Sequence, residues 1–393
     1  MKPIPLLILG DSVTSTSGLG RITRDLATRI HETMQDTFRV ATIGYGGTGS
    51  CKLGFQQYFI HEINQWVVKE LPAAWKDFAG DEHGILLVIW DASRLLWLSH
   101  PEQYCQIPAL REFLMSKPFD LWTYSAIDAE GPNGKLSAAL KLVLEGFDRV
   151  LAYSEWSARI VEKTLGSNIK IDSLPHGIDT SVFYPRMRDK ARRKFGEIVL
   201  GQDFAVDDGK FLVGIVATNQ PRKDWATGIK AVENLTKTED TLLWIHTDTM
   251  ERANGWSIST LLHDYGINTR TIVTLGSLTD EQMAWAYSAC DVTFGIGLGE
   301  GFGFPIYESL ACGTPCIHGS YAGGAEWLPE EFKIEPRAYR AEGQFASLRP
   351  VYDSSQWVEA ALRLRCKTAT LPPELAWSNL WPRWAKWLED GAK

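Results

Sequence analysis

Short apolar runs alternate with stretches of amphipathic spacing along nearly the whole chain. Residues 19–32 are one such stretch, in which Ile22, Leu26 and Ile30 recur at the spacing that places them on one face of a helix. In the first half of the chain, the runs that predict buried strands are residues 5–9, 38–43, 84–90, 120–124, 149–153 and, as a short piece, 170–174. Strands that alternate with helices in this way are typical of parallel βαβ units.

A second series of the same kind follows in the other half of the chain. Its strand-like runs are residues 211–217, 241–246, 271–275, 292–295, 315–318 and a short piece at 332–334. Each series opens with a strand that runs into a loop rich in glycine or polar residues. The pattern therefore predicts an α/β protein with two Rossmann-like, doubly wound domains.

The boundary between the two series is expected between Pro185 and Gly209, where charged residues interrupt the rhythm of the strands. We assign residues 1–190 to the first domain and residues 195–370 to the second. Six cations at the boundary are interpreted as a solvated linker or helix face, with an anionic partner as the alternative; they are Arg186, Arg188, Lys190, Arg192, Arg193 and Lys194.

The last part of the chain predicts a helix with a dense aromatic face. Trp377, Trp381, Trp384 and Trp387 recur there at helical spacing. Such a face is too apolar to be left in water, so we expect residues 376–393 to pack back on the first domain. A dimer interface or contact with a membrane is the alternative.

Composition and charge argue against several classes of protein. With 393 residues the chain is long enough for two domains, and its net charge of −8 does not favour binding to nucleic acid or to an anionic membrane. The six cysteines show no C-x-x-C pair, which suits a reducing compartment and does not indicate a metal site. The apolar run at the N-terminus is too short for a signal peptide or a membrane span, and no other run is long enough. We therefore expect a cytoplasmic protein without a transmembrane segment; its oligomeric state stays open.

The strongest chemical signal lies in residues 299–308, where a glycine-rich loop leads from a strand into a helix. Pro305 suits the first turn of that helix, and Gly313 suits its end. Glycines allow a ligand to approach the backbone, and the free N–H groups of a helix start suit a diphosphate. Glu300 and Glu308, one in the loop and one in the helix, would reach different hydroxyl groups of one bound molecule.

This segment resembles the E-x7-E signature of the retaining GT-B glycosyltransferases, above all the large family 4, also called group 1. Residues 287–292 and 311–315 follow the same family's pattern. The resemblance implies two Rossmann-like domains that face each other across a cleft. It implies that the first domain (residues 1–190) lies on the acceptor side and that the second (residues 195–370) binds the nucleotide-sugar donor. It also implies that Glu300 contacts the hydroxyls of the donor sugar and that Glu308 contacts the ribose. The loop amides expected near the sugar and the pyrophosphate are those of Gly301, Phe302 and Gly303.

A second matching segment, residues 216–225, follows the first strand of the second domain. Lys223 stands at the position of the family's lysine and would neutralise the leaving diphosphate. Thr218 occupies the position of the family's arginine, so Arg222 is the natural substitute. The alternative is a solvated Arg-Lys pair, although positive charge at the start of a helix opposes the helix dipole.

Two loops of the first domain are weaker candidates. Residues 11–21 lack the third glycine of a dinucleotide fingerprint, because Thr23 occupies its position. They resemble the family's Gly-Gly-Leu-Gly loop, in which Gly18 and Gly20 would close over the donor phosphates or the acceptor; a plain βα turn is the alternative.

In the second of these loops, Ile127 stands where many relatives have a histidine that touches the sugar. Asp128 is then the nearest polar candidate for a contact with the acceptor or the sugar. His176 lies in a segment that resembles the family's turn between the domains, and we interpret its role as structural.

Taken together, these residues predict a retaining transferase that uses a UDP-, GDP- or related nucleotide sugar. No cofactor and no metal are expected, because Asp77, Asp81 and Asp91 are dispersed and form no D-x-D motif in a suitable loop. A sugar-nucleotide epimerase and a non-catalytic nucleotide-sugar-binding protein are the rival hypotheses. The acceptor stays open among lipid, polysaccharide, protein, small molecule and a modified nucleic acid base.

Overall fold

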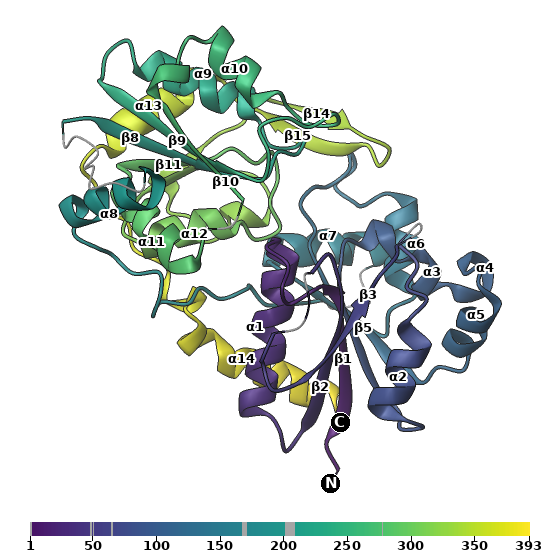
Figure 1. Ribbon diagram of the computed structural model, residues 1–393. Helices are drawn as coiled ribbons and strands as arrows, with labels where there is room; N and C mark the ends of the chain where they lie inside the picture. The colour runs from purple at the N-terminus through teal and green to yellow at the C-terminus, as the bar shows by residue number, and fades with distance from the viewer. Residues whose placement is uncertain are drawn as a thin grey trace. The chain divides into compact units, whose positions relative to one another are not determined.

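Two parallel sheets, each covered by helices, carry the fold of the protein (Figure 1). The computed structural model describes residues 2–47, 49, 51–63, 66–166, 171–200, 209–276 and 278–393. The chain divides into two compact units. The first unit consists of Met1–His176, Gln344–Ala346 and Trp381–Lys393, and the second consists of Gly177–Gly343 and Ser347–Leu380.

The first boundary between the two units therefore falls after His176. This position is earlier in the chain than Pro185–Gly209, the range in which the charged residues predict the boundary. Helix α8 (Arg188–Leu200) explains the difference, because its cations are anchored in the second unit. Arg188 lies 2.7 Å from one carboxylate oxygen of Asp291, and Arg192 lies 2.8 Å from the other. Arg192 is buried, so the interpretation of this run as a solvated face is wrong at that position. Residues 201–208, also within the predicted boundary, lie outside the described residues.

The first unit contains a seven-stranded parallel sheet with the order β3-β2-β1-β4-β5-β6-β7. Its strands are β1 (Ile4–Asp11), β2 (Phe38–Tyr45), β3 (Gln56–Ile60), β4 (Gly84–Ile89), β5 (Phe119–Ser125), β6 (Arg149–Ala152) and β7 (Asp172–Ser173). The central strands are apolar and buried over most of their length because helices cover both faces. All strands of this sheet were predicted except β3. The short predicted run at 170–174 corresponds to β7, and its residue 170 lies outside the described residues.

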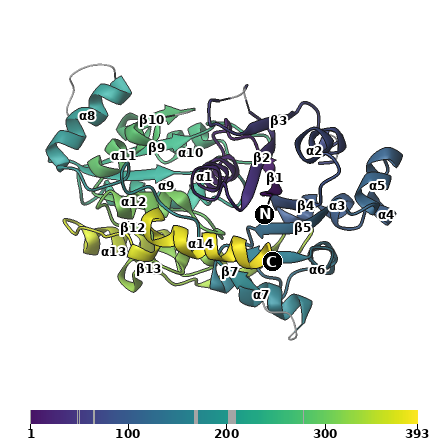
Figure 2. The same cartoon turned by 90° about the horizontal axis from the view of Figure 1, so that it is seen from below.

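Figure 2 shows α1 (Gly18–Thr33) and α14 (Trp377–Gly391) side by side on one face of this sheet. The other face carries α2 (Leu71–Ala79) and α6 (Ala138–Glu145), whose apolar residues share a core with alternate residues of β1. The remaining helical segments of this unit are η1 (Ala92–Arg94), α3 (Leu96–Ser99), α4 (Pro101–Tyr104), α5 (Pro108–Met115) and α7 (Glu155–Leu165).

Two tryptophans of α14 complete the core of the first unit. Trp384 is fully buried, donates a hydrogen bond from its indole N–H to the carbonyl of Pro175 at 3.0 Å, and packs edge-on against Tyr124. Trp387 donates to Asp172 at 3.1 Å and packs edge-on against Trp122. The aromatic face that the sequence indicates is thus buried against strands that lie more than 200 residues earlier in the chain.

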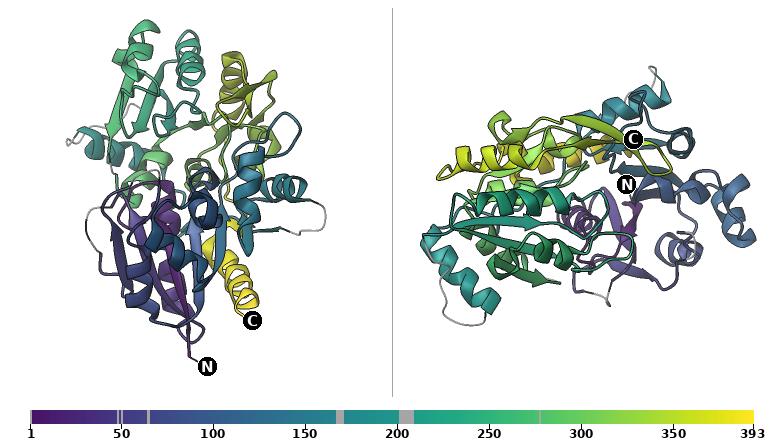
Figure 3. Two further views of the ribbon diagram at one scale, coloured as in Figure 1. Left: turned by 90° about the vertical axis from the view of Figure 1, so that its right-hand side faces the viewer. Right: turned by 90° about the horizontal axis from the view of Figure 1, so that it is seen from above.

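The second unit contains a six-stranded parallel sheet with the order β10-β9-β8-β11-β12-β13. Its strands are β8 (Phe211–Val216), β9 (Thr241–Thr247), β10 (Thr271–Leu275), β11 (Val292–Gly295), β12 (Cys316–Gly319) and β13 (Lys333–Ile334). Helices α9 (Trp225–Leu235), α10 (Ile258–Asp264) and α13 (Ser354–Leu364) cover one face, and α8, α11 (Asp280–Ala289) and α12 (Phe304–Ala311) cover the other (Figure 1). An antiparallel hairpin of β14 (Ala338–Glu342) and β15 (Ser347–Val351), which was not predicted, lies beside this sheet (Figures 1 and 3).

Candidate active site

The loops after β8 and β11 meet at the carboxyl edge of the second sheet. The backbone N–H of Asp224 donates to the carbonyl of Ile296, and that of Leu298 donates to Arg222, both at 2.9 Å. Strand order reverses between β8 and β11, because β9 and β10 extend the sheet on one side and β12 and β13 extend it on the other. Open α/β sheets bind their ligands at such a switch point, beyond the carboxyl ends of the strands.

Lys223, Arg222 and Glu300 converge in these two loops. Arg222 Nη1 lies 3.1 Å from Glu300 Oε2 and 3.0 Å from the carbonyl oxygen of Gly299. Lys223 Nζ pairs with Glu300 Oε1. The side chain of Glu300 is 13% exposed, and that of Lys223 is 11% exposed, so water screens this pair only weakly.

The two cations keep Glu300 ionised. Burial by itself raises the pKa of the Glu300 carboxyl, but the charges of Lys223 and Arg222 outweigh burial and lower the pKa to about 2. The site therefore holds one carboxylate and two cations at neutral pH, which leaves a net positive charge among these three side chains.

Glycines make room for the Glu300 side chain. A Cβ atom on Gly297 would overlap the Glu300 carboxylate, and one on Gly324 would lie 2.7 Å from the Cβ of Glu300. The backbone N–H of Gly324 also donates to the carbonyl of Glu300 at 2.9 Å. Gly303 has a φ of +88° immediately before α12, a conformation that favours glycine.

The remaining predicted residues of the second unit lie further along the same loop and helix. Gly301 and Phe302 are buried, and the Phe302 ring packs against Phe304 and Tyr307 at 5.1 and 4.9 Å. Glu308 is buried in α12, where its carboxylate accepts a hydrogen bond from the Tyr287 hydroxyl at 2.9 Å.

Comparison with known proteins agrees with this geometry. The model of the family "Glycosyl transferases group 1" matches residues 200–333, which include both loops and α12. This part of the chain matches the group 1 glycosyltransferases. The prediction of the family from the E-x7-E segment is thereby confirmed.

Curated relatives match this chain over part of their length. The D-inositol 3-phosphate glycosyltransferase of Pseudarthrobacter chlorophenolicus is 26% identical over 178 residues, 44% of this chain and 40% of the relative. The serotype-specific mannosyltransferase WbdA of Escherichia coli is 26% identical over 136 residues, 34% of this chain and 16% of the relative. The match thus spans less than half the length of these relatives.

Solved structures match over nearly the whole chain and show the fold. The sucrose-phosphate synthase of Thermosynechococcus elongatus superposes with a TM-score of 0.71 at 14% identity, over 98% of each chain. HepE of Anabaena in complex with UDP-glucose gives a TM-score of 0.71 at 13% identity, over 98% of this chain and all of the other. The GT-B fold expected from the sequence, with two Rossmann-like domains, is confirmed.

The candidate residues of the first unit lie at the carboxyl edge of its own sheet. Gly20 packs against the loop after β1, where a Cβ would lie 2.7 Å from the carbonyl oxygen of Ser12. Its N–H donates at 2.9 Å to the hydroxyl of Ser17, which caps α1, while Gly18 is the first residue of the helix and is exposed. Asp128 follows β5 and is partly buried. The packing explains Gly20 as part of a tight turn, and contact of these residues with a ligand stays a prediction.

Two residues next to Glu300 have no signal in the sequence. His318 lies in β12, is 1% exposed, and has its Nδ1 against the carbonyl of Gly295. Because a carbonyl only accepts, Nδ1 carries the proton, and Nε2 has no hydrogen-bond partner in the described part of the chain. Gly324 lies against both His318 and Glu300. Only the fold brings these positions to the site, since His318 lies in β12 and Gly324 follows that strand, whereas Glu300 follows β11.

The described residues also bear on two other classes of site. No helix among them is both long and apolar enough to cross a membrane. They also contain no group of three or more His, Cys, Asp or Glu side chains that could hold a metal ion.

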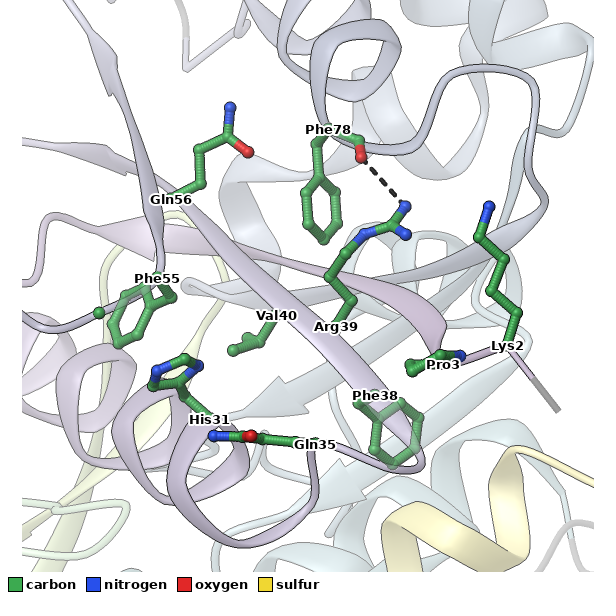
Figure 4. Close-up of a pocket in the computed structure, with 11 residues that line it drawn as sticks. Lys2, Pro3, His31, Gln35, Phe38, Arg39, Val40, Phe55, Gln56 and Phe78 are labelled. Atoms are coloured by element: carbon green, nitrogen blue, oxygen red, sulfur yellow. Dashed lines mark hydrogen bonds between the residues drawn. The ribbon is translucent and has the colours of Figure 1, made fainter.

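A hollow of about 420 Å³ lies elsewhere in the first unit (Figure 4). Its lining includes Lys2, Phe38, Arg39, Phe55 and Phe78. Phe38 begins β2, so the hollow lies at the amino end of the strands, opposite the edge at which parallel sheets bind ligands. None of the predicted site residues lines it, and we assign it no role in the reaction.

Proposed function

We propose that this protein transfers a sugar from a nucleoside-diphosphate sugar to an acceptor hydroxyl with retention of the anomeric configuration. The observation that carries the proposal is the convergence of Lys223, Arg222 and Glu300 at the switch point between β8 and β11. The match of residues 200–333 to the group 1 glycosyltransferases supports the same reaction class.

The two cations suit the leaving group. When the bond between the anomeric carbon and the phosphate oxygen breaks, negative charge grows on the diphosphate. Lys223 and Arg222 would stabilise that charge, together with backbone N–H groups of the loop that leads into α12. Binding of a diphosphate would give both cations a second anionic partner, and the Glu300 carboxylate would then be free to accept hydrogen bonds from sugar hydroxyls.

The position of Arg222 supports its role as the substitute for the family's arginine. Thr218, at the position of the family's arginine, is exposed, whereas Arg222 reaches Glu300 from the neighbouring turn. We propose that Arg222 supplies the second positive charge. We further propose that Glu308, held by Tyr287, contacts the ribose of the donor.

The proposed chemistry is a front-face displacement. The acceptor oxygen forms a bond to the anomeric carbon on the face from which the diphosphate departs, and the acceptor proton passes to the departing phosphate oxygen. Configuration is retained because both bonds lie on the same face. No cofactor enters the balance, and we propose that no metal is required because Lys223 and Arg222 meet the charge of the diphosphate.

The donor is proposed to be a UDP- or GDP-hexose. HepE was solved with UDP-glucose, and the named mannosyltransferase relative uses mannose as its transferred sugar. We also propose that the protein acts in the cytoplasm, because its six cysteines are all free, which suits a reducing compartment.

A donor screen tests the proposal. The protein is mixed with UDP- and GDP-sugars, and the midpoint of thermal unfolding is followed; a donor at 100 times its dissociation constant stabilises the folded state by about 2.7 kcal/mol. The donor that binds is then incubated with a panel of acceptors, and NMR of the product gives its anomeric configuration. A product of inverted configuration contradicts the retaining mechanism.

The same incubation separates the rival functions. An epimerase would convert the sugar of the donor without any acceptor, and a binding protein would leave the donor unchanged with every acceptor. Transfer to an acceptor, or slow transfer to water, supports the proposed reaction alone.

A further inference from the structure

His318 lies buried beside Glu300 and carries one ring nitrogen that is unpaired. The point that a Cβ atom on Gly324 would occupy lies 2.7 Å from Glu300 Cβ and 3.3 Å from His318 Nε2, so both side chains border the same small space. Nδ1 donates to the carbonyl of Gly295, whereas Nε2 has no hydrogen-bond partner in the described part of the chain. A buried acceptor without a partner is destabilising, so its presence in a candidate active site calls for a functional explanation.

Two charged side chains act on the His318 ring. Burial has the largest effect on the pKa of the imidazole and lowers it. The bond to Gly295 and the Glu300 carboxylate raise the pKa, and the Lys223 ammonium lowers it. Because the net shift is downward, the ring is neutral at neutral pH, and Nε2 then holds a lone pair and no proton.

Other charged groups lie on the elements that pack against β12, which are α12, α13, β13 and η4 (Glu330–Phe332). These groups are Glu308, Glu359, Arg363, Lys333, Glu330 and Glu331. Lys333 pairs with Glu330 at 2.6 Å, and Glu308 accepts a hydrogen bond from the Tyr287 hydroxyl. Glu331, Glu359 and Arg363 are exposed to water, which screens their charges. Glu300 and Lys223 are therefore the charges that decide the state of the ring.

Donor binding would change the balance between these two charges. In the proposed function, Lys223 and Arg222 turn toward the diphosphate, and Glu300 loses part of its pairing with them. A buried carboxylate without its cations is strongly destabilised, and the diphosphate brings further negative charge. Both changes favour a positive charge on a neighbouring group that can accept a proton. His318 is such a group, since its unpaired Nε2 borders the space beside Glu300.

We propose that His318 takes up a proton when the nucleoside-diphosphate sugar binds, and that its imidazolium then holds Glu300 in place of the two cations. The proton comes from the solvent, forms the Nε2–H bond, and changes the charge of the ring from zero to +1. Nε2 donates to the Glu300 carboxylate, whose other lone pairs accept from hydroxyls of the sugar. His318 is thus a positioning residue, and the inference rests on the proposed function.

Calorimetric titration counts the protons. UDP-glucose and GDP-mannose are suitable probes because their diphosphates, esterified at both ends, do not titrate near neutral pH. Each is titrated into the full-length protein at pH 7 in PIPES and in imidazole, two buffers that differ in their heat of ionisation. The difference in heat should correspond to uptake of part of one proton for each donor bound. By linkage, the affinity for the donor should rise by up to about tenfold per pH unit as the pH falls from 8 to 6.

Variants of His318 separate the proton from the packing of the ring. His318→Asn retains a donor to Gly295 and lacks Nε2, so proton uptake and its share of the pH dependence should vanish. His318→Gln places an amide that does not titrate near the position of Nε2; it should also take up no proton, but should recover part of the transfer rate that His318→Asn loses. Glu300→Gln should reduce the uptake because the carboxylate that attracts the proton is gone. His263→Asn, on α10 with its side chain 82% exposed, is the control and should behave as the wild type.

Nitrogen-15 NMR of the histidine rings follows the same proton in the wild type, so this measurement does not depend on the folding of a variant. The Nδ1–H tautomer of His318 in the free protein should become an imidazolium in the donor complex at the same pH. Donor binding without proton uptake, or equal uptake by His318→Asn and the wild type, overturns this inference and leaves the proposed function standing. If no nucleotide sugar binds, the proposed function fails, and this inference fails with it.

Discussion

Glu300 shares both of its carboxylate oxygens with cations that we assign to the diphosphate. Glu300→Gln should therefore lower the rate of transfer by about 100-fold or more, because a contact with the sugar is weakened. Its affinity for the nucleoside diphosphate should stay equal or increase, because Lys223 and Arg222 lose their anionic competitor. Calorimetric titration with UDP and GDP measures the affinity, and Glu330→Gln, on an exposed carboxylate, is the control.

Lys223→Ala should act in the opposite way on binding. The variant loses a cation of the diphosphate site, so both the affinity for the nucleoside diphosphate and the rate of transfer should fall, the latter by about 100-fold. Lys237→Ala, near the end of α9 and 57% exposed, is the matched control. Wild-type turnover in a folded Lys223→Ala protein would show that the site is wrongly assigned.

Buried histidines should make stability depend on pH. Burial lowers the pKa of His318 and of His176, so below pH 6.5 the unfolded chain binds protons that the folded protein does not. Stability is therefore lost as the pH falls from about 6.5, by up to about 1.4 kcal/mol per pH unit for each histidine. Denaturant unfolding between pH 7.5 and 5.5 measures the slope.

His318→Asn provides the comparison, because the amide nitrogen of asparagine can replace Nδ1 as the donor to Gly295. The slope of stability against pH should be smaller in this variant than in the wild type by the contribution of one histidine. An unchanged slope would show that His318 is protonated in the folded protein.

Some residues of the candidate active site could be predicted from the sequence and others could not. Lys223, Arg222 and Glu300 stand in short segments whose glycines and charges are themselves the signal. His318 and Gly324 have no such signal, because their positions follow from strand order and from contacts between distant segments.

At the scale of elements, α14 supplies the clearest stability prediction. Trp384→Ala removes a fully buried indole and its hydrogen bond to Pro175, and should lower the free energy of unfolding by roughly 3–5 kcal/mol. Trp381→Ala, at a partly exposed position of the same helix, should cost less. Chemical denaturation compares the two variants. Equal losses in the free energy of unfolding would mean that the buried face of α14 stabilises the protein no more than its partly exposed positions do.

Buried strands were predictable because they are continuous apolar runs, as in β1 and β4. The edge strand β3 contains two glutamines and is only partly buried, so it carries no such run. The hairpin of β14 and β15 is largely exposed and gives no apolar pattern. Helix α8 was misread because five of its seven charged side chains are cationic, although two of them are anchored by Asp291.

At the scale of the whole molecule, the reaction is expected to proceed without a divalent metal. In the proposed mechanism, the charges of Lys223 and Arg222 take the place of a metal cation beside the diphosphate. Transfer activity should therefore stay unchanged after treatment with a chelator. A full loss of activity in the chelator, restored by magnesium or manganese, would contradict this expectation.

The first unit is assembled from both ends of the chain, and this has a consequence for biosynthesis. During translation its strands emerge first, but Trp384 and Trp387 follow about 200 residues later, which at 5–20 residues per second is a delay of roughly 10–40 s. The second unit is complete on the ribosome before then. Until α14 arrives, the apolar face around Trp122 and Tyr124 lacks its cover, so the nascent first unit is expected to depend on chaperones during that interval.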